Sequence, residues 1–176
     1  MHEPKGVAAA SSGEVYVADG AASGDWLPFD QHISGYVAFD SATPAYSHST
    51  TTSDTVLNPT FSVQGTPVGF SGLSSPNARL RYDGTPSVHA VVNAAFSVKQ
   101  ASGTSKDIEL ALFKNGVEVT GTRSVRTISS GSWANVSFNT VITMATNDYV
   151  EVFIKADSAH TTQFAGAQLT IHAIPA

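Results

Sequence analysis

The chain of 176 residues has no cysteine, which excludes disulfide frameworks, iron–sulfur clusters, cysteine-ligated zinc sites and thiol catalysis. Charge is scarce as well: only 13% of the residues are charged, about half the usual share for a globular protein. The nine basic residues form no cluster, which argues against nucleic-acid binding. No window has the length and hydropathy of a membrane span, and no apolar stretch of signal-peptide length follows Lys5. We therefore expect a soluble protein that is made in the cytoplasm.

Helical periodicity is missing, and alternation of apolar and polar residues takes its place. The segment Ser87–Lys99 has an apolar residue at every second position from Val88 to Val98, as a strand with one buried face does. Asn115-Gly116 is the strongest short hairpin signal in the chain. About eight such strands lie after residue 78 or just before it, with the spacing typical of an all-β sandwich. With 41% hydrophobic residues, the chain is long enough for one well-cored domain.

The first 34 residues differ from the rest, because they contain one short strand, Glu14–Asp19, between small residues. Such a strand cannot build a core of its own and needs a partner surface. We therefore expect two parts: an extended N-terminal arm over 1–34 and a β-sandwich domain over 35–176.

The order of several motifs resembles the globular head domain of complement-type proteins, which share the tumour necrosis factor jelly roll. The segments Lys106–Gly116, Asn147–Ile154 and Phe164–Ile171 carry this resemblance, together with Gly35–Asp40 and Tyr82-Asp83-Gly84. The resemblance implies a jelly-roll β-sandwich that assembles as a homotrimer. The candidate residues for the trimer interface are His89, Val91, Phe113 and His172. Histidines buried there would make assembly sensitive to pH.

Bacterial viruses use the same jelly roll, and the Ala/Ser/Gly-rich N-terminus is similar in style to small virion proteins of tailed phages. This second resemblance implies a trimeric capsid decoration (cement) or head-fibre protein of the virion. The arm would bind the major capsid protein or another virion protein by adding its strand to an exposed sheet edge. The residues expected to make that contact are Val15, Tyr16, Val17, Trp26, Leu27 and Phe29.

No motif in the sequence indicates catalysis or a cofactor. The six histidines lack metal-ligand spacing, and no G-x-S-x-G, H-E-x-x-H or P-loop pattern occurs. The acidic residues at strand ends, Asp83, Asp107, Asp148 and Asp157, are typical of turns, where the carboxylate accepts backbone hydrogen bonds, although calcium remains an alternative. We expect no enzyme activity, no cofactor and no metal.

The alternative function is a receptor-binding tail-fibre tip that binds a glycan on the host surface. The loops Ser129–Ser132 and Asp157–Thr161 are its candidate binding elements, and Tyr46, Tyr82 and Trp133 are candidates for an aromatic shelf.

Overall fold

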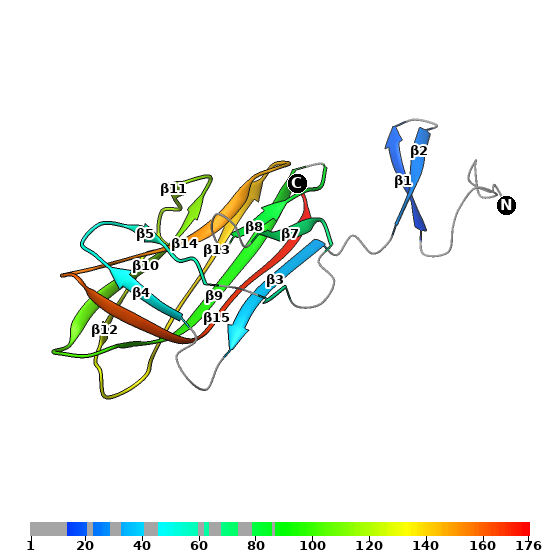
Figure 1. Ribbon diagram of the computed structural model, residues 1–176. Helices are drawn as coiled ribbons and strands as arrows, with labels where there is room; N and C mark the ends of the chain where they lie inside the picture. Colours follow the sequence, from blue (N-terminus) through cyan, green and yellow to red (C-terminus); the bar gives the residue numbers. More distant parts are fainter. Residues whose placement is uncertain are drawn as a thin grey trace. The chain divides into compact units, whose positions relative to one another are not determined.

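The computed structural model describes residues 14–20, 23–28, 33–40, 46–59, 62–63, 68–73, 79–85 and 87–176. Every regular element in these ranges is a β-strand, as the alternating sequence predicts (Figure 1). The described residues contain no helix that is long and apolar enough to cross a membrane. The chain divides into two compact units, residues 1–32 and residues 33–176.

The N-terminal unit contains a two-stranded antiparallel sheet formed by β1 (Glu14–Gly20) and β2 (Ser23–Pro28). The expectation that this strand lacks a local partner is therefore wrong. The residues after the first strand turn back and pair with it, so that Tyr16 lies opposite Trp26. A sheet of two strands is marginally stable by itself in water.

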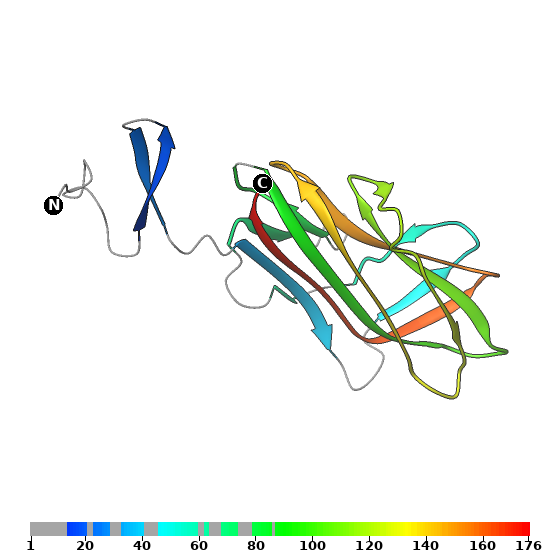
Figure 2. The same ribbon diagram turned by 180° about the vertical axis from the view of Figure 1, so that it is seen from behind.

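One sheet of the C-terminal unit has six strands in the order β13-β9-β15-β3-β6, with β4 also paired to β15. Strands β13, β9, β15 and β3 are neighbours in this order, which can be followed in Figure 2. The bounds are β3 (Ile33–Asp40), β4 (Tyr46–Thr50), β6 (Ser62–Val63), β9 (Val88–Gln100), β13 (Ala134–Met144) and β15 (His160–Pro175). Because β3 begins at Ile33, the sheet includes the last two residues that were assigned to the arm.

The other sheet has seven strands. Its main order is β11-β10-β14-β8-β7, with β12 also beside β10 and β5 beside β14. The bounds are β5 (Thr55–Val56), β7 (Phe70–Leu73), β8 (Arg79–Tyr82), β10 (Lys106–Lys114), β11 (Val117–Glu118), β12 (Ser124–Ile128) and β14 (Tyr149–Ala156).

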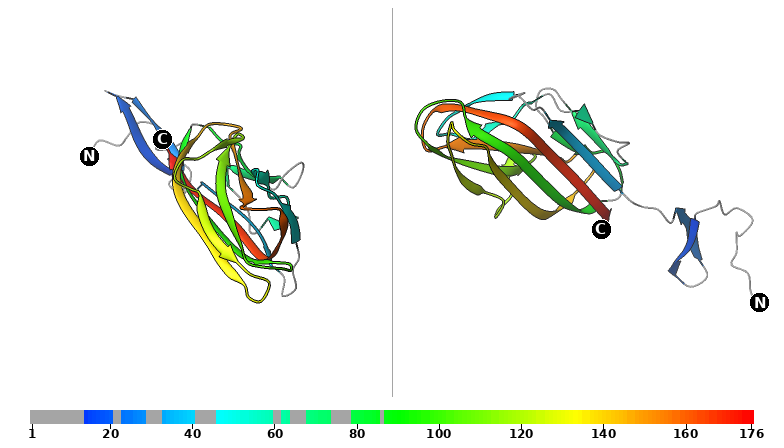
Figure 3. Two further views of the ribbon diagram at one scale, coloured as in Figure 1. Left: turned by 90° about the vertical axis from the view of Figure 1, so that its left-hand side faces the viewer. Right: turned by 90° about the horizontal axis from the view of Figure 1, so that it is seen from below.

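From β8 to β15 the chain passes repeatedly from one sheet to the other, and all pairings in both sheets are antiparallel. The two sheets form two layers, which Figure 3 shows from two directions. This arrangement confirms the predicted fold class, an all-β jelly-roll sandwich.

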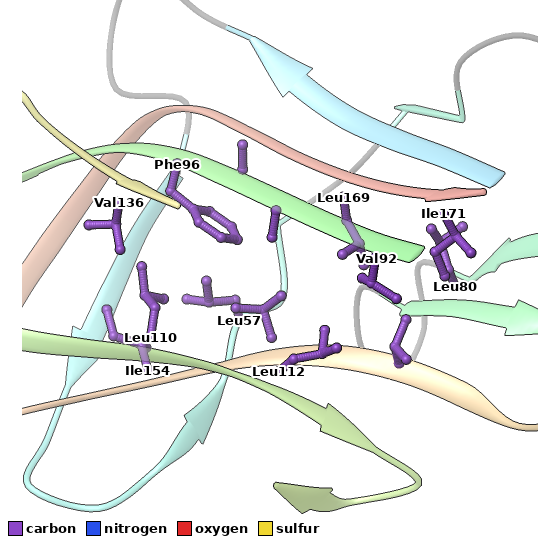
Figure 4. Packing of buried hydrophobic residues seen from close by; sticks show 14 of the residues in the cluster. Leu57, Leu80, Val92, Phe96, Leu110, Leu112, Val136, Ile154, Leu169 and Ile171 are labelled. Carbon is purple, nitrogen blue, oxygen red and sulfur yellow. The ribbon is translucent and has the colours of Figure 1, made fainter. Parts of the chain in front are cut away.

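The core lies between the layers and contains the side chains that the alternation placed inward. Every second residue of β9 from Val88 to Val98 is buried, as predicted. These side chains face Leu110 and Leu112 of β10 and Ile154 of β14, which the close-up shows together (Figure 4). Burial of each large aliphatic side chain contributes about 1.5–3 kcal/mol, so this interior holds the two sheets together.

Turns gather at the two ends of the sandwich. At the end where β3 begins, the main chain of Asn147 donates to Tyr82 and the hydroxyl of Thr146 donates to the carbonyl of Gly84. Asn115 and Gly116 form the predicted hairpin turn there, with φ of 51° and 79°.

The opposite end of the sandwich includes the loops at residues 101–105, 129–133 and 157–159. Gln100 N donates to the carbonyl of Ser129, and Ala101 N donates to the carbonyl of Thr161. These bonds link the first two of these loops to each other and to the beginning of β15, which directly follows the third loop.

Candidate functional site: an uncharged sheet face

Over most of the outer face of the six-stranded sheet, the described side chains carry no charge. Strand register places alternate residues of β13, β9, β15 and β3 on this face, in rows that run across the four strands. We call the following residues the neutral face: Asn135, Ser137, Asn139, Val141 and Thr143 of β13; His89, Val91, Asn93, Ala95 and Ser97 of β9; Gln168, Thr170, His172 and Ile174 of β15; Ser34, Tyr36 and Ala38 of β3. Lys99 lies at its border, with its ammonium 4.8 Å from the ring centre of Trp133.

The seven-stranded sheet, in contrast, carries many charged side chains. Seven ion pairs join side chains of this sheet and of the loops beside it. Arg123 contacts three carboxylates, those of Asp54, Glu109 and Glu118, and Lys155 also pairs with Glu109. The hydrogen bonds that the Arg123 guanidinium donates to Glu118 and Asp54 raise its pKa. A sandwich with one ionic face and one neutral face is suited to hydration on the first and contact on the second.

One end of the neutral face is apolar. Val91, Val141 and Ile174 are 43%, 66% and 65% exposed. Val91 lies directly between Val141 on β13 and His172 on β15. The structure therefore brings together three of the four residues predicted for the trimer interface, because His89 also lies on this face, with Nδ1 3.3 Å from the Thr143 hydroxyl.

Phe113, the fourth candidate, is on the other sheet and does not share the neutral face with the other three. It lies on β10, is only 9% exposed, and stacks on Phe153 of β14 with ring centres 4.0 Å apart. The alternation of residues along β10 places Phe113 correctly on the side away from the core. It could not show that the ring of Phe153 covers Phe113.

The other end of the neutral face is hollowed because its side chains are small. A depression of about 500 Å³ is lined in part by Ala38, Ala95, Ser97, Ser137 and Gln168. Tyr36 of β3 forms one of its sides. The depression can accept side chains from a molecule that covers the face.

The residues proposed for attachment lie mainly in the β1–β2 hairpin. Val15 pairs with Leu27 and Tyr16 with Trp26, while Val17 pairs with Asp25. Phe29 lies outside the described residues. The pairing places most of the proposed contact residues on one small sheet, but it does not show what they bind.

The ring nitrogens of His48, His89 and His160 have hydroxyl or carbonyl partners. No group of three or more histidine and acidic side chains in the described ranges is placed to hold a metal ion. Asp148 instead caps a turn, where its carboxylate accepts hydrogen bonds from Ala145 N and Asn115 Nδ2. These groups are arranged to stabilise turns and crossovers.

The three aromatic residues considered for a sugar-binding shelf do not form one. Tyr82 is fully buried, with its ring centre 5.2 Å from that of Phe70. Tyr46 is half-buried and hydrogen-bonds to His48. Trp133 is exposed beside Lys99, at a distance in the fold from Tyr82 at the other end of the sandwich.

Comparisons with known proteins support the fold alone. No family model matches the sequence, and no curated protein matches it. Among solved structures, Eiger TNF from S. frugiperda is 8% identical and has a TM-score of 0.52, with coverage of 82% of this chain and 94% of that one. Murine APRIL at pH 5.0 is 13% identical with a TM-score of 0.51, covering 82% and 100%. PRD1 vertex protein P5 is 12% identical with a TM-score of 0.48, covering 81% and 96%. On the likeness to Eiger and APRIL, residues 33–176 have a tumour necrosis factor-like jelly-roll fold.

Proposed function

We propose that this chain is a structural protein of a tailed-phage virion, without enzyme activity, that assembles as a homotrimer through its neutral face. In this proposal it serves as a capsid decoration or head-fibre protein, and residues 1–34 attach the trimer to the major capsid protein or another virion protein.

The observation that carries the proposal is the chemical difference between the two faces of the sandwich. Interface cores are depleted in charged residues, and the neutral face has no charge among its outward side chains. Burial of Val91, Val141 and Ile174 contributes about 25 cal/mol for each Å² of apolar area removed from water. A neighbouring copy would also fill the depression beside Tyr36. Three-fold symmetry follows from the resemblance to the trimeric head domains.

The role of residues 1–34 as an attachment segment rests on the β1–β2 hairpin. This sheet has two strands only, so each strand has one edge without a partner in the described sheet. An added strand from a capsid or tail protein would supply main-chain hydrogen bonds, and Trp26, Leu27 and Phe29 would act as apolar anchors. A trimer presents three such hairpins, which raises the total affinity through effective concentration. The virion as the site of attachment follows from the similarity of the N-terminal composition to small phage virion proteins.

A second candidate function, a tail-fibre tip that binds a host glycan, is favoured by the position of the loops. The loops at residues 129–133 and 157–159 lie at the end opposite the beginning of β3. If the chain is attached through the residues before β3, these loops lie at the opposite end of the sandwich, where they can contact a host glycan.

Attachment is tested by removing residues 1–32, which leaves β3 complete, and mixing the purified product with virions that lack the protein. The expected result is a trimer that no longer sediments with virions, while the full chain does, at hundreds of copies per particle. Sedimentation of the shortened trimer with virions would contradict attachment by the N-terminal segment. A few to a few dozen copies per particle, together with binding on a glycan array, would support the tail-fibre alternative.

A further inference from the structure

A second feature of the sandwich, distant from the neutral face, is the crossover that joins its two sheets between β4 and β5. β4 pairs with β15 in the six-stranded sheet, and β5 pairs with β14 in the seven-stranded sheet. In this connection the carbonyl of Thr51 accepts a hydrogen bond from Ala156 N. Directly after β5, Leu57 N donates to the carbonyl of Val152. The crossover therefore joins the layers directly.

His48 is at the centre of a chain of hydrogen bonds across this connection. Its Nε2 lies 2.8 Å from the Thr55 hydroxyl, and its Nδ1 lies 2.8 Å from the Tyr46 hydroxyl. The Thr55 hydroxyl donates to the carbonyl of Ile154 at 3.1 Å, and the Tyr46 hydroxyl accepts from Asn58 N at 3.0 Å. We call Tyr46, His48, Thr55 and Asn58 the crossover latch.

The direction of these bonds determines the protonation state of the imidazole. The Thr55 hydroxyl has one proton and gives it to Ile154, so it accepts from His48, whose Nε2 must carry a hydrogen. A neutral imidazole then has an acceptor at Nδ1, which the Tyr46 hydroxyl fills. The latch is complete only with neutral His48, because a second proton on Nδ1 would point at the Tyr46 O–H.

The described side chains that hydrogen-bond to His48, those of Tyr46 and Thr55, carry no negative charge that could stabilise an imidazolium. On its own strand, Tyr46 is an uncharged phenol, and burial raises the pKa of that phenol. On β15, Thr162 lies directly opposite His48, and its hydroxyl is 2.9 Å from Nε2 of a second histidine, His160.

The charged residues next to β5 and on β14 are engaged elsewhere. Asp54, which precedes β5, pairs with Arg123, and Lys155 of β14 pairs with Glu109. Burial accordingly lowers the pKa of His48.

We propose that the crossover latch is an acid-sensitive joint, which protonation of His48 opens, releasing residues 46–58 from the two sheets. Above the ordinary histidine range the latch is closed and contributes its full stability. As pH falls through that range the unfolded and open forms bind a proton that the closed form resists, so the closed form loses stability. The core strands do not depend on this group and stay protected.

Amide hydrogen exchange of the full chain at pH 7.5 and pH 5.0, corrected for intrinsic exchange, tests the proposal. We expect exchange of residues 46–58 to increase at least tenfold at pH 5.0, relative to β9 in the same sample. In His48→Gln this difference should disappear, because glutamine supplies one donor and one acceptor but does not titrate. His160→Gln is the matched control and should retain the difference.

A second measurement keeps the test decisive if the glutamine variant folds poorly. Histidine NMR of the unmodified chain should show the neutral tautomer with hydrogen on Nε2 of His48 at pH 7.5. In Tyr46→Phe, which removes the donor to Nδ1, the pH midpoint of His48 should move upward. A hydrogen on Nδ1 at pH 7.5, or the same acid-induced exchange in His48→Gln, would overturn the proposal.

Discussion

The carboxylate of Asp148 contacts two turns at one end of the sandwich, and we call these contacts the turn clasp. Substitution of Asp148 by asparagine tests whether they stabilise the fold. Asp148 Oδ1 accepts from Asn115 Nδ2 at 2.6 Å, and Oδ2 accepts from Ala145 N at 2.8 Å and pairs with Lys114 Nζ at 2.8 Å. The side chain is 17% exposed, so these contacts are only partly screened by water. One carboxylate thus joins the β10–β11 and β13–β14 turns.

An asparagine has nearly the same shape but one acceptor oxygen fewer and no charge. Its amide nitrogen must face one of the donors, Asn115 Nδ2, Ala145 N or Lys114 Nζ, so at least one charge-assisted hydrogen bond is lost, at about 1.5–3 kcal/mol. The pair with Lys114 adds about 0–1 kcal/mol at this exposure. We expect Asp148→Asn to lower the free energy of unfolding by about 1.5–4 kcal/mol at pH 7.

Urea unfolding of the two proteins at several pH values is the assay. Burial alone would raise the pKa of Asp148, but the hydrogen bonds from Lys114, Ala145 and Asn115 outweigh it and hold the pKa below its usual value. The stabilisation is therefore fully present above the unfolded-state pKa, and it is lost as pH falls through the lower, folded-state pKa. The difference between the two proteins should shrink accordingly in acid.

Asp83→Asn serves as the control for this substitution. Asp83 is also a turn aspartate, and its carboxylate pairs with Arg81, but both side chains are more than a third exposed. Replacement of Asp83 should cost less than about 1 kcal/mol. Equal losses in the two variants, or a loss at Asp148 that does not depend on pH, would refute the role assigned to the clasp.

Two further substitutions address packing. Phe113→Ala should lower the free energy of unfolding by about 3–5 kcal/mol, the usual range for a buried phenylalanine. It should leave the association state unchanged, which a mass measurement by light scattering checks. Dissociation of the assembly would show that Phe113 lies at the interface after all. Gly84→Ala should lower the free energy of unfolding in urea by about 1–3 kcal/mol, because its Cβ would lie 2.7 Å from the hydroxyl and 2.9 Å from ring atoms of the buried Tyr82. The control Gly131→Ala, which has open space around its Cβ, should be nearly neutral. Equal effects at the two glycines would contradict this reasoning.

The features that the sequence predicts correctly depend on short-range alternation and turn chemistry. The inward side chains of β9 alternate strictly, and Asn115-Gly116 supplies two residues that tolerate positive φ, so both features were predictable from local residues. The jelly roll followed from the order of such strands together with the family resemblance.

The features that were missed depend on contacts between distant segments. β2 contains Gly24, Asp25 and Pro28, residues that disfavour strands, and therefore its pairing with β1 carried no local signal. The cover of Phe113 comes from Phe153, forty residues away in the sequence. His48 depends on Thr55 across the crossover, and nothing in the alternation of β4 indicates that contact.

The neutral face became apparent only when strand register was known, although one part of it has a sequence signal. From Thr127 to Asn147 the chain contains no charged residue, and this stretch includes the whole of β13. The other strands of the face carry charges within a few residues, and only their register shows that these point elsewhere or lie at the border.

The most direct test of the central claim, assembly through the neutral face, is sedimentation equilibrium of the full chain at micromolar concentration. The account predicts a mass of about three times the 18.3 kDa chain for the unmodified protein and for Val125→Lys, whose side chain is 63% exposed on the ionic sheet. For Val141→Lys, which places a charge on the neutral face, it predicts the mass of a single chain, with circular dichroism unchanged. A single-chain mass for the unmodified protein, or a trimer that Val141→Lys leaves intact, would contradict the account.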